Sequence, residues 1–338
     1  MDRQTEITTP GALLNEKGDL ARPGFSRALV QEYRRADVKV SPLRIKEWDY
    51  YLVNNGKFAL ALTVADNGYM GLDSVSLLDL EEGWEITKSP MSFLPLGKKH
   101  LPETSVTGDV HSAARGYGIH FIHEGEKRVL IAYMNKFGES ALSARVELTE
   151  CPEDSLVIAT PFDKPGHFYY NQKIVGFRAS GYVNYNGKTY TFEPSDSFAV
   201  LDWGRGVWTY DNTWYWGSGS GTVDGHRFGF NIGYGFGDTS AASENILFYD
   251  GVGHKLDDVT FLISDNYTDP WKFTSSDGRF EMDFVPIIDR AALLDVKLIC
   301  SDQHQVFGRM SGTAVLDDGT KVVLKDFLCF AEKVHNKY

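Results

Sequence analysis

The stretch that decides the fold lies past the middle of the chain, where residues 214–221 read WYWGSGSG and residues 228–237 read FGFNIGYGFG. In the first run every second residue from 217 onward is glycine, and in the second run glycine occupies every second position but one. A period of two is typical of a β-strand, whose successive side chains point to opposite faces of a sheet. Both runs therefore predict strands with an aromatic face and a glycine face, and the glycine face lets a second sheet, a loop or a ligand approach the backbone.

These glycines do not form the motifs of two common enzyme classes. The G-x-G-x-x-G spacing of dinucleotide-binding proteins is absent, and no helix follows to receive a pyrophosphate. Residues 217–221 do not form a G-x-S-x-G elbow, because position 219 is glycine. The sequence thus argues against a dinucleotide-binding protein and against a serine hydrolase.

The rest of the chain repeats a pattern of short strands separated by turns. Apolar or alternating runs that predict strands cover residues 45–53, 58–64, 74–80, 128–133 and 144–148. The Asn-Gly step at 186–187 and the Asp-Gly step at 318–319 each predict a type I′ hairpin turn. We therefore expect an all-β protein of two antiparallel β-barrel or sandwich domains with few short helices.

We divide the chain into an N-terminal arm and two β domains. Residues 1–40 form the arm, which we expect to lie over the first domain and to hold a short helical stretch near 26–33. Pro161, Pro165 and Gly166 cluster between two strand-rich regions and mark a boundary. This gives an N-terminal β domain over 41–163 and a C-terminal β domain over 164–338, and the length of 338 residues suits two cores.

Composition and charge restrict the partners. Lys and Arg number 34 and Asp and Glu number 46, and the net charge of −12 argues against nucleic acid or an anionic membrane surface as the partner. Cys151, Cys300 and Cys329 lack the spacing of a disulfide framework or a zinc motif. With no signal peptide or long apolar run, we expect a cytoplasmic protein without stable membrane insertion, metal or cofactor, whose partner is a small molecule. The sequence carries no signal of the oligomeric state.

Candidate catalytic residues gather around the tryptophans, of which four of only seven in the chain are Trp203, Trp208, Trp214 and Trp216. Asp202 precedes the first of them, and burial among indoles would raise the pKa of its carboxyl and suit it to proton donation. Arg205 would orient Asp202, or the two would form a purely structural ion pair. Glu244 would be a second carboxyl of an acid/base pair, or a turn residue at the surface.

Further candidates for ligand binding flank this segment. His167, Tyr169, Tyr170 and Asn171 form a polar aromatic cluster that would either bind a ligand or join the two domains. Asn231 and Tyr234 lie on the second glycine-rich strand. The aromatic faces of these strands suit either tight packing between sheets or the wall of a ligand pocket.

Residues 45–51, 166–171, 201–208 and 233–238 resemble the bacterial family called domain of unknown function 2804 (DUF2804), and the resemblance covers about residues 10–331. More distantly, the order of residues 166–170, the 180–190 hairpin and the Trp-rich element at Asp202 is similar to the carotenoid 1,2-hydratase and AttH-like proteins. That resemblance implies two lipocalin-like β domains and an aspartate, here Asp202, that protonates an alkene. Those relatives usually carry an Asp-Arg-Glu-Trp run where WGRG intervenes here at 203–206, so the fold is implied more strongly than the chemistry.

Three functions are consistent with these features. The first is a cofactor-independent hydratase, isomerase or cyclase, or a binder, that acts on an apolar or amphiphilic small molecule. The second is a glycosidase or sugar binder with Trp platforms and the carboxylates of Asp202 and Glu244, which would lie roughly 5 to 10 Å apart across an open groove. The third is a non-catalytic lipid carrier, whose cavity would hold no group of perturbed pKa.

Overall fold

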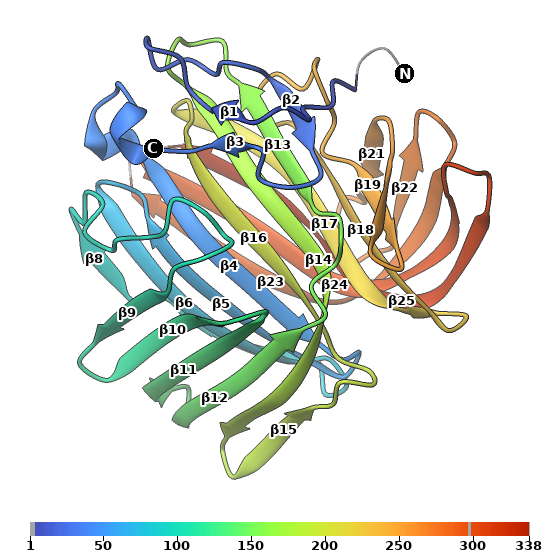
Figure 1. Ribbon diagram of the computed structural model, residues 1–338. Coiled ribbons are helices and arrows are strands. Elements are labelled where there is room, and N and C mark those ends of the chain that lie inside the picture. Colours follow the sequence, from blue (N-terminus) through green and yellow to red (C-terminus); the bar gives the residue numbers. More distant parts are fainter. Residues whose placement is uncertain (1–3, 297–298, 338) are drawn as a thin grey trace.

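Two large antiparallel β-sheets make up most of the computed structural model, which describes residues 4–296 and 299–337 (Figure 1). The first sheet has fourteen strands: β2 (Gly24–Ser26), β4 (Lys46–Asn54), β5 (Phe58–Asp66), β6 (Met70–Asp79), β7 (Trp84–Lys88), β8 (Met91–Phe93), β9 (Val110–Ala114), β10 (Tyr117–Glu124), β11 (Lys127–Phe137), β12 (Ser140–Thr149), β13 (Leu156–Pro161), β14 (Phe168–Tyr185), β15 (Lys188–Phe192) and β16 (Phe198–Val207). The second sheet has nine: β17 (Asp211–Val223), β18 (His226–Tyr234), β19 (Ile246–Tyr249), β20 (Val252–Lys255), β21 (Val259–Leu262), β22 (Trp271–Ser275), β23 (Phe280–Val296), β24 (Ile299–Val315) and β25 (Lys321–Lys337).

Little of the described chain lies in other secondary structure. Strands β1 (Gly11–Ala12) and β3 (Gln31–Glu32) form a small parallel pair, and short 3-10 turns cover Arg35–Asp37 and Pro42–Arg44. The expected all-β class with few short helices is therefore confirmed.

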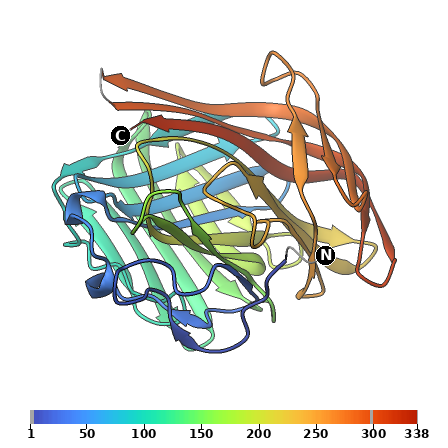
Figure 2. The ribbon, with the colours of Figure 1, turned by 90° about the horizontal axis from the view of Figure 1, so that it is seen from above.

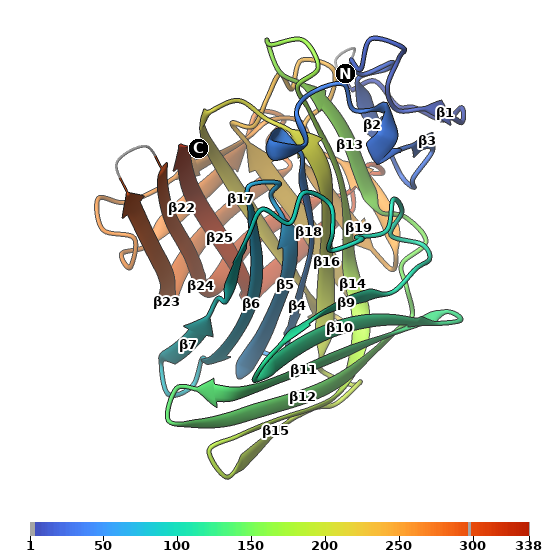
Figure 3. The same ribbon diagram turned by 90° about the vertical axis from the view of Figure 1, so that its left-hand side faces the viewer.

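The first sheet curls into a half-barrel (Figure 3). Its hydrogen-bonded order runs β7-β6-β5-β4-β16-β14-β12-β11-β10-β9. The carboxylate of Asp73 in β6 links the two ends of this order, because it accepts hydrogen bonds from Ser112 Oγ of β9 at 2.8 Å and from Tyr117 Oη of β10 at 2.9 Å. The interior of the curl is one apolar core, to which Tyr51 of β4 and Phe121 of β10 contribute rings 4.7 Å apart.

The second sheet, yellow to red in Figure 2, packs against the first through the glycine face of β18. Phe228, Phe230 and Ile232 of β18 point the other way and are fully buried in the second sheet's own core. A Cβ at Gly229 would lie 2.8 Å from Val175 Cγ1 of β14, so the absent side chain lets the two sheets come close. A third apolar cluster, with side chains from both sheets, fills the space between them.

Most of the predicted strands and turns are confirmed, with two corrections. Asn186 and Gly187 both have positive φ, 49° and 76°, as a type I′ turn requires. At 318–319 only Gly319 does, and five residues separate β24 from β25, so the expected type I′ turn there is wrong. The expected helical stretch near 26–33 is also wrong, because Ser26 pairs with β13 and Gln31 pairs with β1.

Strand pairing changes sheet later than the boundary expected at 163/164. Residues 168–207, which the sequence assigned to the second domain, supply β14, β15 and β16 of the first sheet, and the second sheet begins at Asp211. The arm also reaches past the first sheet, since Thr5 N donates to Ala241 O at 2.7 Å. The division into an arm and two β domains stays a prediction.

A close cross-strand contact between Trp48 and Gly204 lies on the face of the first sheet that borders the second sheet. Gly204 of β16 lies opposite Trp48 of β4, and a Cβ at position 204 would lie 2.0 Å from Trp48 Cζ2. The missing side chain therefore lets the indole lie against the β16 backbone. In that position the Trp48 ring stacks on Tyr169, with the two planes 12° apart.

We expect Gly204→Ala to lower the free energy of unfolding by about 1–3 kcal/mol, because the added methyl overpacks the site against the indole. Urea unfolding of the wild type, Gly204→Ala, Trp48→Leu and the double variant measures the effect. The double variant should lose less than the sum of the two single losses. Strict additivity would contradict the close Trp48–Gly204 contact.

Candidate functional site

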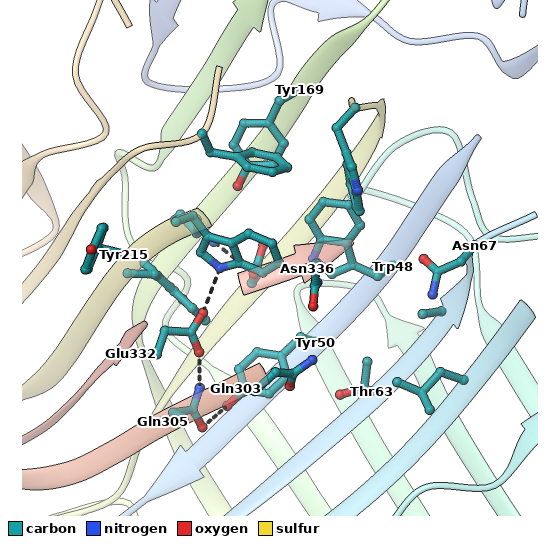
Figure 4. Close-up of a pocket in the computed structure, with 18 of the residues that line it drawn as sticks. Trp48, Tyr50, Thr63, Asn67, Tyr169, Tyr215, Gln303, Gln305, Glu332 and Asn336 are labelled. Atoms are coloured by element: carbon teal, nitrogen blue, oxygen red, sulfur yellow. Dashed lines mark hydrogen bonds and ion pairs between the residues drawn. The ribbon is translucent and has the colours of Figure 1, made fainter. Parts of the chain in front are cut away.

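A cavity of about 220 Å³ lies between the two sheets (Figure 4). The first sheet contributes side chains from β4, β5, β6, β14 and β16, and the second from β17, β23, β24 and β25. Its lining residues are Trp48, Tyr50, Thr63, Ala65, Asn67, Leu72, Tyr169, Lys173, Asp202, Trp208, Trp214, Tyr215, Trp216, Phe236, Glu244, Arg290, Gln303, Gln305, Glu332 and Asn336. The cavity is therefore a feature of the contact between sheets and not of one barrel.

Aromatic rings form one wall of the cavity around Phe236. The Phe236 ring makes edge contacts with Tyr169, Trp208 and Trp214, with centroids 4.8, 5.3 and 5.2 Å away. Phe236 follows β18 between Gly235 and Gly237, whose φ angles of 89° and 76° lie in the region that favours glycine. These two glycines thus turn the chain after β18 so that the Phe236 side chain reaches the aromatic wall.

A chain of hydrogen bonds crosses the opposite side of the cavity and is drawn as dashed lines in Figure 4. Glu332 of β25 accepts hydrogen bonds from Trp214 Nε1 at 3.1 Å and from Gln305 Nε2 at 2.9 Å. Gln305 Oε1 in turn accepts one from Tyr50 Oη at 3.4 Å. Burial raises the pKa of Glu332, and the two donated hydrogen bonds oppose that rise.

Asp202 is held by two partners on β14. Lys173 Nζ lies 2.8 Å from Asp202 Oδ2, and Asn171 Nδ2 donates to Oδ1 at 2.5 Å. Lys173 also lies 3.8 Å from the centroid of the Trp216 ring, a cation–π contact that reaches the second sheet. Both oxygens of Asp202 are therefore occupied by protein groups.

Glu244 differs from the other two carboxyls in the cavity. The residue is only 5% exposed, and its carboxyl makes no hydrogen bond or ion pair with any other side chain of residues 4–296 and 299–337. Burial raises the pKa of Glu244 to about 7, while Lys173 lowers it, Asp202 raises it and Lys255 lowers it. A buried carboxyl that is partly protonated near neutral pH suits proton transfer.

The expected partnership of Asp202 and Arg205 is corrected by the structure. Residues three apart on a strand point to opposite faces, and Arg205 points into the first barrel, where its Nη2 lies 2.9 Å from Asp49 Oδ1. Trp203 lies on that same inner face, with its ring over the Arg205 guanidinium. Neither side chain lines the cavity between the sheets.

The remaining predicted residues divide between the cavity and other places. Tyr169, Trp208, Trp214, Trp216, Asp202 and Glu244 line the cavity, and Asn171 supports Asp202 from beside it. Asn231 lies behind the wall, where it accepts from Trp216 Nε1 at 2.7 Å and donates to the backbone oxygen of Glu244 at 2.7 Å.

Three other predicted ligand-binding residues do not line the cavity. Tyr170 Oη donates to Gln31 O in the interior of the first sheet, and Tyr234 stacks on Tyr215 and packs against the core of the second sheet. His167 lies in a separate surface depression beside Arg44 and Lys164.

Sequence reasoning missed several lining residues that strand parity could have indicated. Trp48 and Tyr50 are two apart on β4, and Lys173 is two residues after Asn171, so each pair shares a face. Gln305 and Glu332 could not be found in this way, since they meet only because β24 pairs with β25.

A metal site and a membrane-spanning helix are two further features to consider in the described residues. No three or more His, Cys, Asp or Glu side chains within 4–296 and 299–337 are placed to hold a metal ion together. No helix in the described part of the chain is long and apolar enough to cross a membrane.

Comparison with solved structures finds similar folds at low sequence identity. A candidate AttH protein from Nitrosomonas europaea is 12% identical, with a TM-score of 0.51 over 90% of this chain and 96% of that one. Kievitone hydratase from Nectria haematococca is 11% identical (TM-score 0.44, 87% and 88% covered), and CghA is 9% identical (TM-score 0.42, 97% of each). The first of these supports the expected lipocalin-like fold of AttH-like proteins.

Comparison with curated proteins finds no match. A family model described as "Domain of unknown function (DUF2804)" matches residues 4–338. The expected family resemblance is thereby confirmed, and the chain belongs to the DUF2804 family.

Proposed function

We propose that this protein is a cofactor-independent enzyme that transfers a proton to or from an apolar or amphiphilic small molecule bound between the two sheets. Hydration, isomerisation and cyclisation of an alkene are reactions of this type. The observation that carries the proposal is the buried carboxyl of Glu244, which has no bonded side-chain partner among the described residues and faces an aromatic-walled cavity.

Glu244 takes the role of proton donor that the sequence suggested for Asp202. Lys173 and Asn171 hold both oxygens of Asp202, so a proton on that carboxyl would have to displace one of them. The Glu244 carboxyl meets no such competition, and its pKa of about 7 places the acid and base forms in similar amounts at neutral pH.

The walls suit the charge that alkene protonation creates. A carbocation beside the faces of Trp48, Trp208 or Trp214 would be stabilised by the ring quadrupoles, and the aromatic lining limits the access of water.

The carbohydrate hypothesis is supported by one observation, namely that Asp202 and Glu244 line the same cavity beside tryptophans. Against it, Asp202 and Glu244 are both buried residues, 7% and 5% exposed, whereas a glycosidase needs a groove that admits a sugar chain. The carrier hypothesis requires only the cavity and the walls. The experiments below distinguish these functions.

The reaction is tested by incubating the protein in D₂O with a mixture of extracted isoprenoids and polyketides, followed by mass spectrometry of the products. Proton transfer to carbon predicts deuterium in a product that forms only with protein. Glu244→Gln should lower its rate of formation by about 100-fold or more, the usual contribution of a general acid.

Glu16→Gln removes an exposed carboxyl that does not line the cavity and should leave the rate unchanged. Recovery of unlabelled ligands from both the wild-type and the variant proteins would favour a carrier. Hydrolysis of an oligosaccharide panel that requires both Asp202 and Glu244 would favour a glycosidase instead.

The raised pKa of Glu244 also predicts how stability depends on pH. The folded carboxyl has a pKa of about 7 and an unfolded glutamate about 4.3, so between these values the folded state binds more protons. The free energy of unfolding of the wild type, relative to Glu244→Gln, should therefore fall by about 3 kcal/mol as the pH rises from 4.5 to 7.5.

Urea unfolding of both proteins across this range measures the difference, with Glu16→Gln as the control for loss of a surface charge. Parallel stability curves for wild type and Glu244→Gln would show that the Glu244 carboxyl is not destabilised by burial.

A further inference from the structure

A second cavity, of about 510 Å³, opens at one end of the first barrel and shares no lining residue with the cavity between the sheets. The β10–β11 turn, the segment between β12 and β13 and the loop before β9 surround it. Its lining residues are Arg27, Ala28, Ser105, Val106, His123, Gly125, Glu126, Lys127, Arg128, Glu150, Cys151, Pro152, Glu153, Ser155, Gln172 and Ile174.

Arg128 is the buried cation of this cavity. It is 8% exposed, and its guanidinium lies 5.1 Å from the centroid of the Phe177 ring. Its single hydrogen bond to a described residue runs from Nη1 to Tyr51 Oη at 2.9 Å, and no carboxylate of the described residues lies within 4.0 Å. A guanidinium has five N–H donors, so most of its capacity to bind an oxyanion is unused.

The other cations around the cavity are already paired. Arg27 contacts Glu6 at 3.1 Å and Asp154 at 3.0 Å, and Lys127 lies 3.7 Å from Glu147. Asp49 acts electrostatically on Arg128 from the interior of the first sheet, but its carboxylate is engaged by Arg205.

The acidic residues at this cavity lie at its rim. Glu150 contacts Arg178 and Arg227 at 3.7 and 3.8 Å, and Glu126 and Glu153 are exposed. These carboxylates face solvent, so none of them neutralises the buried guanidinium.

A histidine lies beside Arg128, and its Nε2–H is already donated to a backbone carbonyl. This residue, His123 of β10, is the cross-strand partner of Arg128 on β11, so the two side chains share the inner face of the sheet. His123 Nε2 lies 3.1 Å from Ser105 O, while His123 Nδ1 is buried with no hydrogen-bond partner in the described structure and lies 4.0 Å from Asp109 Oδ1.

We propose that this cavity is a binding site for a small molecule that carries a carboxylate or phosphate group, with the guanidinium of Arg128 as its anchor. The planar fork of an arginine binds either oxyanion through two parallel hydrogen bonds. Val106, Pro152 and Ile174 supply apolar surface for the remainder of the molecule. This site is independent of the proposed proton transfer between the sheets.

Isothermal titration of the full chain with inorganic phosphate, and separately with butyrate, tests the site and distinguishes the two anions. Arg128→Met should weaken binding of the preferred anion by roughly 10- to 100-fold, the usual effect of losing a charged hydrogen-bonding group. Lys136→Gln removes an exposed cation from the same strand and should leave binding unchanged, as should Glu244→Gln in the other cavity. Equal affinity of wild type and a folded Arg128→Met would overturn the proposal.

A measurement on the wild type keeps the test decisive if Arg128→Met fails to fold. Cys151 lines the cavity, so a bound anion should slow its alkylation by N-ethylmaleimide several-fold, with half-protection at the dissociation constant from titration. Peptide mass spectrometry reads Cys151 separately from Cys300, which should show no protection. Absence of protection at Cys151 by saturating phosphate and butyrate would overturn the proposal.

Discussion

The ammonium group of Lys173 is shared by three buried carboxyl groups, and this shared cation sets the chemistry of the cavity between the sheets. It forms an ion pair with Asp202 and acts electrostatically on Glu244 and Glu332. Arg290 adds a second positive charge that acts on Glu332. Lys255 also acts on Glu244 and lowers its pKa, so it is burial that raises the pKa of this carboxyl to about 7. A buried carboxylate without a bonded partner is costly, and Glu244 has no bonded side-chain partner among the described residues, so its carboxyl is partly protonated near neutral pH.

The position of Lys173 is set by contacts with both sheets. Lys173 lies opposite Asp202 on neighbouring strands β14 and β16, and it touches the Trp216 ring on β17. The sheets approach closely enough for this contact because Gly229 of β18 has no side chain to hold Val175 of β14 away. The alternating glycines thus let the two sheets approach closely. The aromatic residues between them line the cavity or join a core, depending on which face of the strand they occupy.

Strand parity explains which parts of the site the sequence could predict. The period of two in residues 214–221 correctly separates Trp214 and Trp216 from Tyr215, which also borders the cavity but whose ring stacks on Tyr234 and packs against the second core. The same rule applied to Asp202 and Arg205, which are three apart, would have placed them on opposite faces, as the structure does. The hydrogen-bonded chain of Tyr50, Gln305 and Glu332 was beyond prediction, because it depends on the pairing of strands far apart in the sequence.

The most direct test of this account is a carbon-13 NMR titration of glutamate-labelled protein, with the Glu244 carboxyl signal assigned by its loss in Glu244→Gln. The account predicts that this carboxyl titrates with a pKa of about 7. It also predicts that Lys173→Met raises the value further, because the main cation opposing the proton is then absent. A Glu244 carboxyl that titrates near the value of a solvated glutamate, about 4.3, would contradict the account.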